Sequence, residues 1–391
     1  MASILYGWVG IYYGQTALMV DTWTYHYFGL QETRLLLSNP AEYLSNTFNN
    51  HNDFSNFLTA TNSFWNDLKI KFITKLLSIC NIFSFGNYYI NALFFSFLTF
   101  FGPVAFYRIL KDLFTAKSAT PALVIGCFLL PSFIYWTSGI HKDGLLFCGI
   151  CFIIYHLYFS LRRNRFRLKS MVFILLGFLL IILLRNFLVV LIIPALIAWV
   201  LATKFPQKKI GVFVLTYLVS GVLFFNAKYI HPNLDFPSIV AFKQSEFMDM
   251  YGGSIVHVQR LEPAAASFLR LLPQAIDLSI FRPHPSDVIH LLSLAAFIET
   301  VIFWILTLLY FVFPKKMEGD HSFLLFCIFF SFSLLLCIGY TVNFVGAIVR
   351  YRSIVLPFLI TPMLVLTDWP RIRLILLRLN GRKGSAAAMN T

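Results

Sequence analysis

The chain has 391 residues, of which 58% are hydrophobic and only 12% are charged, and its formal net charge is +14. Soluble domains are nearer half apolar and a quarter charged, so this is the composition of a membrane protein. The Lys and Arg residues fall in short clusters between apolar runs. That pattern is typical of charges that orient membrane spans and argues against a nucleic-acid-binding surface.

Ten apolar runs are candidates for crossing a hydrocarbon core, which takes roughly 20 helical residues. They cover about 2–19, 89–107, 119–138, 145–160, 170–184, 187–203, 210–226, 288–313, 322–342 and 353–367. The first is the weakest, because three glycines and Gln15 interrupt it. We therefore predict an all-α, polytopic integral membrane protein with about ten transmembrane helices. A single transmembrane domain would cover 1–370, and a basic cytoplasmic tail 371–391.

Basic clusters occur in every second loop between these runs, as the positive-inside rule expects of cytoplasmic loops. They include RRNRFRLK at 162–169 and the basic C-terminal tail. This spacing places the N-terminus in the cytoplasm and two large loops, about 20–88 and 227–287, outside. Apolar residues at helical spacing over 65–79, and the segment 267–285, predict interfacial helices in these loops.

Residues 170–203 are apolar except for Arg185-Asn186, and basic clusters flank both ends. Two crossings would keep both clusters in the cytoplasm, but each would be only about 15–17 residues, short for a core about 30 Å thick. Arg185 would then lie below the outer surface, in a local thinning or an aqueous cavity. The alternative is a single long tilted helix, which would invert the orientation of everything after it.

The first candidate catalytic residue is Asp21, in VDTWTYH directly after the first apolar run. With Tyr25 and His26 it would form an aromatic, hydrogen-bonding cluster at the outer interface. One interpretation is an interfacial aromatic belt with one solvated carboxylate. The other is a general base, or a carboxylate that organises a divalent metal, at a membrane-face active site. The spacing alone favours the belt.

A set of cationic residues is predicted to face the same outer surface: Lys142, Arg185, Arg350 and Arg352. Lys142 and Asp143 share a turn too short to leave the headgroup level, although opposite charges can also simply neutralise each other at a helix end. The two later arginines lie just outside the last span, where snorkelling is the ordinary explanation. Charged groups at membrane depth are nevertheless costly and tend to line functional cavities. Arginine forks and a lysine suit phosphate oxygens, so we predict a site for a lipid-linked phosphate with Asp21 and Asp143 nearby.

The layout resembles that of polytopic glycosyltransferases with the GT-C type of fold. The resemblance rests on VDTWTYH after the first span, on the long first external loop with its interfacial helix, and on the later large external loop. PSFIYWTSGIHKDGLL, 131–146, is similar to a turn of bacterial members and surface-polysaccharide proteins. GAIVRYRSIVLP, 346–357, is similar to an arginine-containing turn of envelope polysaccharide polymerases. The resemblance implies catalytic carboxylates at Asp21 and Asp143, and sugars taken from polyprenyl-phosphate carriers outside the cytoplasm.

The leading hypothesis is an enzyme, a glycosyltransferase of bacterial envelope glycan assembly in the inner (cytoplasmic) membrane, with its active site on the external, periplasmic side. It would move a sugar from a polyprenyl-(di)phosphate-linked donor to a glycan or lipid-linked acceptor. The expected partners are membrane lipid, this donor and this acceptor, without nucleic acid. The cationic set would hold phosphate, His26 and Tyr25 would line the substrate site, and Asp21 would hold the metal if there is one.

Three alternatives remain open on the sequence. An O-antigen or capsule repeat-unit polymerase also uses external arginines and lipid diphosphates, but needs no carboxylate base at Asp21. A lipid-glycan flippase or transporter would place charges deep within broken spans, and Glu299, inside an apolar run, is the best evidence for it. The third alternative is a non-catalytic assembly scaffold.

Overall fold

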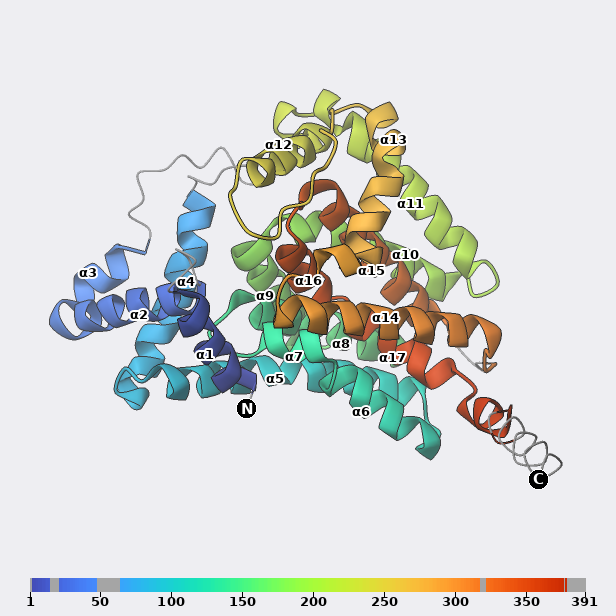
Figure 1. The fold of residues 1–391 in the computed structure, drawn as a ribbon, viewed down its shortest axis with the longest axis horizontal. Helices are drawn as coiled ribbons and strands as arrows, with labels where there is room; N and C mark the ends of the chain where they lie inside the picture. Colours follow the sequence, from blue (N-terminus) through green and yellow to red (C-terminus); the bar gives the residue numbers. More distant parts are fainter. Residues whose placement is uncertain (1, 15–20, 48–63, 317–320, 376, 378–391) are drawn as a thin grey trace, which may run out of the picture.

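The computed structural model describes all residues except 1, 15–20, 48–63, 317–320, 376 and 378–391. Its regular structure is helical throughout, and the described residues form only two isolated β-bridges, Ile255 with Phe344 and Pro314 with Thr367. The predicted all-α class is therefore confirmed. Figure 1 shows most helices gathered into one bundle, with α2 and α3 at one edge of it.

Within the described part of the chain, seven helices are long and apolar enough to cross a membrane. They are α5 (Tyr88–Leu113), α8 (Lys142–Arg162), α9 (Leu168–Arg185), α10 (Phe187–Lys204), α11 (Lys209–Asn226), α14 (Leu291–Val312) and α15 (Ser322–Thr341). Two bent pairs raise the number of candidate spans among the described residues to as many as nine. A polytopic membrane protein is thus supported, and the exact count of about ten spans stays a prediction. Of the first predicted run, 2–19, the structure describes the helix α1 (Ala2–Gly14), and 15–20 lie outside the described residues.

The two bent pairs replace two of the straight spans predicted from the sequence. In the first, α6 (Thr120–Phe128) and α7 (Pro131–Thr137) meet at 46°. In the second, α16 (Val345–Ser353) and α17 (Leu356–Leu366) meet at 63°. A proline stands in the first turn of each second helix, where its missing N–H is tolerated, and it disfavours a continuous helix through the preceding residue. The two arginines predicted to lie just outside the last span are on α16, the first helix of this bent pair.

The stretch 170–203 forms two helices, α9 and α10, that meet at Asn186. The Asn186 side chain accepts a hydrogen bond from the Phe187 backbone N–H at 2.9 Å and so caps the second helix. Each helix alone has the length and hydropathy of a span, which favours two crossings over one long helix. α9 packs closely on α8, since a Cβ added to Gly177 would lie 2.6 Å from the carbonyl oxygen of Gly149.

The predicted loop 20–88 contains α2 (Asp21–Ser38), α3 (Pro40–Ser45) and α4 (Phe64–Ser84). The helix predicted over 65–79 is therefore present within α4. Glu32 of α2 accepts hydrogen bonds from Lys71 and Lys75 of α4, at 3.2 and 3.0 Å, which ties these two helices together.

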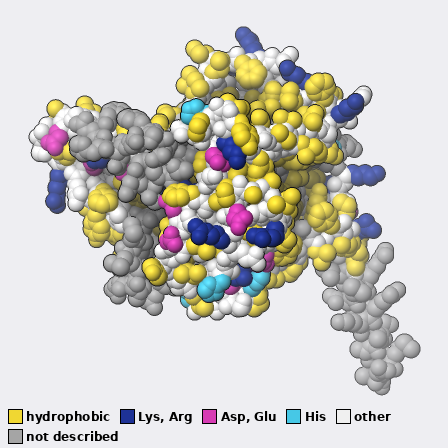
Figure 2. Space-filling view, turned by 90° about the horizontal axis from the view of Figure 1, so that it is seen from above, with side chains coloured by type: hydrophobic (Ala, Val, Ile, Leu, Met, Phe, Trp, Pro, Cys, Tyr) yellow, Lys and Arg dark blue, Asp and Glu magenta, His cyan; other side chains and the backbone are white. Residues whose placement is uncertain are grey.

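The predicted loop 227–287 is also helical in large part. It contains α12 (Phe236–Met248) and α13 (Ala265–Ile276), the latter continued by a π-helical turn, η4 (Asp277–Phe281). This segment also holds three single 3₁₀ turns, η2 (Ala227–Tyr229), η3 (Pro232–Leu234) and η5 (Pro285–Asp287), and a fourth, η1 (Lys117–Ala119), precedes α6. Both α12 and α13 pack against α15. Figure 2 views the molecule from the side where α12 and α13 lie, and charged and histidine side chains gather among apolar ones on that face.

Candidate functional site

The turn between α7 and α8 brings the site together. α7 ends at Thr137, and Gly139 then adopts a φ of +80°, a conformation that favours glycine because it has no Cβ. The chain turns back and His141 becomes the N-cap of α8, so that Asp143 falls in the first helical turn. A carboxylate there is favoured by the unpaired N–H groups and the positive end of the helix dipole.

Asp143 is completely buried and is surrounded by cationic and hydrogen-bonding groups. Its Oδ1 accepts a hydrogen bond from Nη2 of Arg185 at 2.7 Å, and its Oδ2 accepts one from Nε of Arg350 at 2.8 Å. Nδ1 of His141 lies 2.9 Å from the same Oδ2. The predicted convergence of Asp143 with two of the arginines is therefore present, and His141 joins them. We call Asp143, Arg185, Arg350 and His141 the ion cluster.

The hydrogen bonds fix the tautomer of His141. Nδ1 lies within reach of both Oδ2 of Asp143, at 2.9 Å, and the Asp143 backbone nitrogen, at 3.3 Å. A guanidinium can only donate, which makes Nε2 the acceptor toward Arg350. We therefore assign the proton to Nδ1, where it points at the charged carboxylate, in preference to Nδ1 accepting from the Asp143 N–H. Nε2 then carries the lone pair, which accepts from Nη2 of Arg350. Asp143, His141 and Arg350 thus form a closed ring of hydrogen bonds.

Arg185 links the ion cluster to an open cavity. Its guanidinium carbon lies 3.9 Å from the ring centroid of Tyr351, a cation–π contact that holds the side chain at the cavity wall. The cavity has a volume of about 270 Å³ and is lined by residues of α4, α8, α9, α10, α12, α15 and α16. Its lining includes Arg185 and Lys142 from the predicted cationic set.

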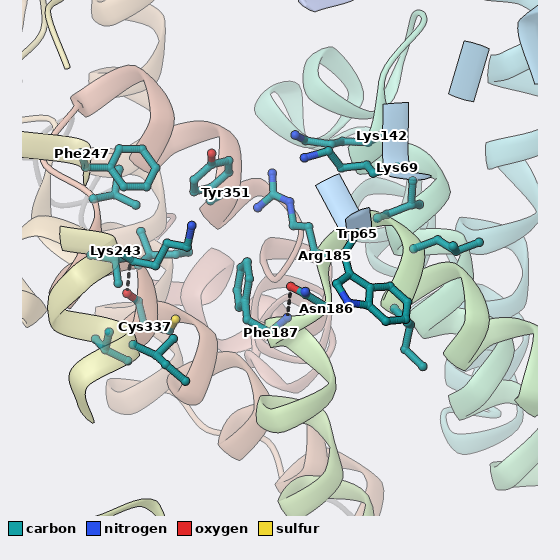
Figure 3. A pocket seen from close by; sticks show the side chains of 18 residues that line it. Trp65, Lys69, Lys142, Arg185, Asn186, Phe187, Lys243, Phe247, Cys337 and Tyr351 are labelled. Carbon is teal, nitrogen blue, oxygen red and sulfur yellow. Dashed lines mark hydrogen bonds between the residues drawn. The ribbon is translucent and has the colours of Figure 1, made fainter. Parts of the chain in front are cut away.

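The cavity lining combines cations with apolar and aromatic side chains. Lys69 and Lys142 lie on one side, Lys243 approaches from α12, and Arg185 lies between them (Figure 3). The aromatic side chains of the lining are Trp65, Phe187, Phe247 and Tyr351. The aliphatic side chains come mainly from α9, α12 and α15. Among the described residues that line the cavity none is a carboxylate, so its chemistry suits an anion attached to an apolar chain.

Sequence reasoning missed part of this lining. Lys69 and Trp65 belong to the amphipathic stretch predicted as an interfacial helix, and their spacing gave no sign that one face of it closes a cavity. Lys243 and Phe247 lie on α12, in a stretch without a recognisable motif. Their spacing of four residues, which places them on the same helix face, is the only local signal.

Arg352 is not among the cavity-lining residues. Its Nη1 donates to the carbonyl oxygen of Arg282 at 2.7 Å and to those of Ser279 and Ile280 at 3.4 Å. Its Nη2 donates to Oγ1 of Thr300 at 2.9 Å. The side chain is almost fully buried, so these contacts tie α16 to the segment after α13 instead of facing a ligand.

Tyr25 and His26 also lie apart from the cavity lining. Both are buried on α2, and the His26 ring packs edge-on against Trp23 and Tyr88. Burial lowers the pKa of His26, and its Nδ1 has no hydrogen-bond partner among the described residues. This aromatic packing agrees with the interfacial-belt interpretation of VDTWTYH better than with a substrate site.

The predicted catalytic position Asp21 begins α2, but its side chain lies outside the described part of the structure. Contacts of α2 with α1, and of α1 with His141, link this position to the ion cluster. Trp23 donates from Nε1 to the Gly7 carbonyl of α1 at 3.0 Å, and the neighbouring Tyr6 ring lies 6.0 Å from the ring of His141. α1 therefore connects the start of α2 with the turn that carries Asp143. Among the described residues no three His, Cys, Asp or Glu side chains are grouped to hold a metal, so a metal at Asp21 stays a prediction.

Comparisons of this chain with protein-family models, with curated proteins and with solved structures gave no match. The functional argument therefore rests on the geometry of the ion cluster and the cavity.

Proposed function

We propose that this chain is a membrane glycosyltransferase, which moves a sugar from a polyprenyl-(di)phosphate-linked donor to an acceptor at the external face in the assembly of envelope glycan. The single observation that carries the proposal is the cavity beside the ion cluster. The cavity is lined by both cationic and apolar side chains. A lipid-linked phosphate has an anionic headgroup that would pair with the cations and an apolar chain that would pack on the apolar walls.

In the proposed reaction, Lys69, Lys142, Arg185 and Lys243 hold the donor phosphate. The bond between the sugar's anomeric carbon and the phosphate oxygen breaks, and a new bond forms to the acceptor oxygen. The acceptor's hydroxyl proton passes to a carboxylate, for which Asp21 is the candidate. The phosphate leaves as an anion, and the cations stabilise the charge that develops on it. Asp143 accepts from two arginines and a histidine, so its role is to hold Arg185 and Arg350 in place.

A repeat-unit polymerase is the second candidate, and one observation favours it. None of the described cavity-lining residues is a carboxylate, and this mechanism needs cations for a lipid diphosphate but no base at Asp21. A lipid-glycan flippase is favoured by the two bent spans and by Glu299 buried in α14.

The test is a sugar-transfer assay with purified chain in lipid, in which polyprenyl-monophosphate and polyprenyl-diphosphate sugars are offered as donors. The variants are Asp21→Asn and Arg185→Gln, with Lys228→Gln as a control that removes a lysine outside the cavity lining. The proposal expects transfer by the parent chain and the control, and a loss of at least about 100-fold in both site variants, the range of a lost catalytic base or charge clamp. Full transfer by Asp21→Asn would favour the polymerase, and binding of the lipid without transfer would favour the flippase.

A further inference from the structure

Two consecutive residues of α14 hold the two bent spans. Oε1 of Glu299 accepts a hydrogen bond from the Ser132 backbone N–H at 2.9 Å, in the first turn of α7. Oγ1 of Thr300 accepts one from Nη2 of Arg352 at 2.9 Å, near the end of α16. A single turn of α14 thus contacts the second helix of one bent pair and the first helix of the other.

The contact at Ser132 satisfies a backbone N–H that the bend between α6 and α7 leaves without a helical partner. The first N–H groups of a helix have no partner within it, and at membrane depth an unsatisfied donor is costly. Ser132 is the second residue of α7, directly after Pro131, and Glu299 is 5% exposed. The Glu299 oxygen therefore supplies the acceptor that the start of α7 lacks.

The contact at Arg352 fixes the other bent pair. Its guanidinium bridges Thr300 of α14 and the carbonyl oxygens of Ser279, Ile280 and Arg282. Arginine suits this role because its planar fork donates in several fixed directions, which a lysine cannot reproduce. The position of the end of α16 relative to α14 is thereby set from two directions.

The Glu299–Ser132 contact lies near the turn that carries Asp143, and the Thr300–Arg352 contact lies near Arg350. α7 leads through Thr137 into the turn that carries Asp143, and Arg350 lies two residues before Arg352 on α16. α7 and α16 also pack against each other. A shift of either helix relative to α14 would change the distance between Asp143 and Arg350, which is now 2.8 Å between Oδ2 and Nε.

We propose that Glu299, Thr300 and Arg352 are positioning residues. They hold α7 and α16 in fixed positions relative to α14 and so keep Asp143 and Arg350 within hydrogen-bond distance. Glu299 acts as a hydrogen-bond acceptor at the start of α7. This role does not require Glu299 to take up or release a proton, and it gives Arg352 a task other than phosphate binding. The inference is independent of the sugar-transfer proposal, because it concerns only how the ion cluster is assembled.

The test is a double-mutant cycle on the full chain in detergent, read as thermal unfolding temperature. Asp143→Asn and Arg350→Gln are made singly and together, first in the parent chain and then in Glu299→Met and Glu299→Gln. In the parent chain the two losses are expected to be non-additive by several degrees, because the residues contact each other. In Glu299→Met the non-additivity should fall by at least half, and Glu299→Gln, which keeps an acceptor oxygen, should restore it.

Two further variants keep the test decisive. Thr300→Val removes the acceptor for Arg352, together with the hydroxyl's own hydrogen bond to the Ala296 carbonyl within α14. It should also reduce the non-additivity, and it provides the test if Glu299→Met does not fold. Ile302→Ala, on the exposed side of α14, is the matched control and should leave the cycle unchanged. Undiminished non-additivity in Glu299→Met and Thr300→Val would overturn the proposal. So would an equal effect of Glu299→Gln and Glu299→Met, which would point to a role for the carboxyl proton itself.

Discussion

Asp143 and Arg350 lie 207 positions apart in the chain, yet Nε of Arg350 donates to Oδ2 of Asp143 at 2.8 Å. Asp143 lies in the first turn of α8 and Arg350 lies on α16, so their contact joins two helices that are far apart in the sequence. Burying Asp143 and Arg185, with Arg350 half-buried beside them, is costly unless the charges are paired with good geometry. The closed pairing of Asp143 with Arg185, Arg350 and His141 meets that condition.

The first prediction concerns the central carboxylate. Asp143→Asn should destabilise the folded chain by about 3 kcal/mol, because it leaves the buried Arg185 and the half-buried Arg350 without a counter-charge. A triple variant in which Asp143 becomes Leu and both arginines become Met should recover much of that stability, since apolar groups carry no desolvation cost. Chemical denaturation in detergent measures both. A triple variant as unstable as Asp143→Asn would show that the loss comes from packing and not from unpaired charge.

The second prediction concerns the ring under Arg185. Tyr351→Phe keeps the aromatic face and should bind a long-chain polyprenyl phosphate as the parent chain does. Tyr351→Ala removes the cation–π contact, worth about 0.5–2 kcal/mol, and should weaken binding by about threefold or more. Titration of the lipid against intrinsic fluorescence gives the two affinities. Equal binding by the Phe and Ala variants would mean that the ring does not hold the guanidinium in its binding position.

The third prediction concerns charge at the cavity. Lys69→Gln and Lys243→Gln should each weaken binding of the lipid phosphate and reduce its dependence on salt, because each removes one cation from the lining. Lys228→Gln, which lies outside the lining, should change neither. Binding measured at three ionic strengths separates these cases. If binding of the lipid phosphate depends on salt as strongly after both lining lysines are lost, the phosphate binds outside this cavity.

The fourth prediction concerns pH and the pairing of α2 with α4. Burial raises the pKa of Glu32, but hydrogen bonds and charges from Lys75 and Lys71 outweigh it and hold the pKa below the usual glutamate value. The folded state therefore gains stability from this group above the usual glutamate pKa, near pH 4, and loses it as the pH falls through the lowered folded-state value. Hydrogen exchange in α2 and α4 should accelerate as the pH is lowered from 5 to 3, after correction for the intrinsic exchange rate. In Glu32→Gln the corrected rate should be nearly independent of pH over this range.

Much of the fold follows from the sequence, because apolar length and basic clusters are properties of single segments. The helices at 88–113, 142–162 and 168–204 fall close to their predicted places. The bends at Pro131 and Pro357 were not predicted, since a proline near the start of a helix and a proline after a bend give the same local signal. At these two places the sequence analysis therefore predicted straight spans where the structure has bent helix pairs.

The site was predictable only in part. Charged residues stand out in apolar runs, so Lys142, Asp143, Arg185 and Arg350 could be selected from the sequence, and the structure brings them to one region. Arg352 follows Arg350 by two positions and looked equivalent, but a two-residue step on a helix turns the side chain to another face. Its partners are three backbone carbonyls, which leave no trace in a sequence, and the hydroxyl of the distant Thr300.

The central claim, that the cavity binds a lipid-linked phosphate, is tested most directly by native mass spectrometry of the purified chain with a long-chain polyprenyl diphosphate. The parent chain and Lys228→Gln should retain one lipid diphosphate each. The double variant Lys142→Gln and Lys243→Gln, which keeps Arg185 and the ion cluster, should lose at least ten-fold in affinity while the unphosphorylated polyprenol binds equally weakly to all three. Equal retention of the diphosphate by all three proteins would contradict the account, because the phosphate would then be held without the cations of the cavity.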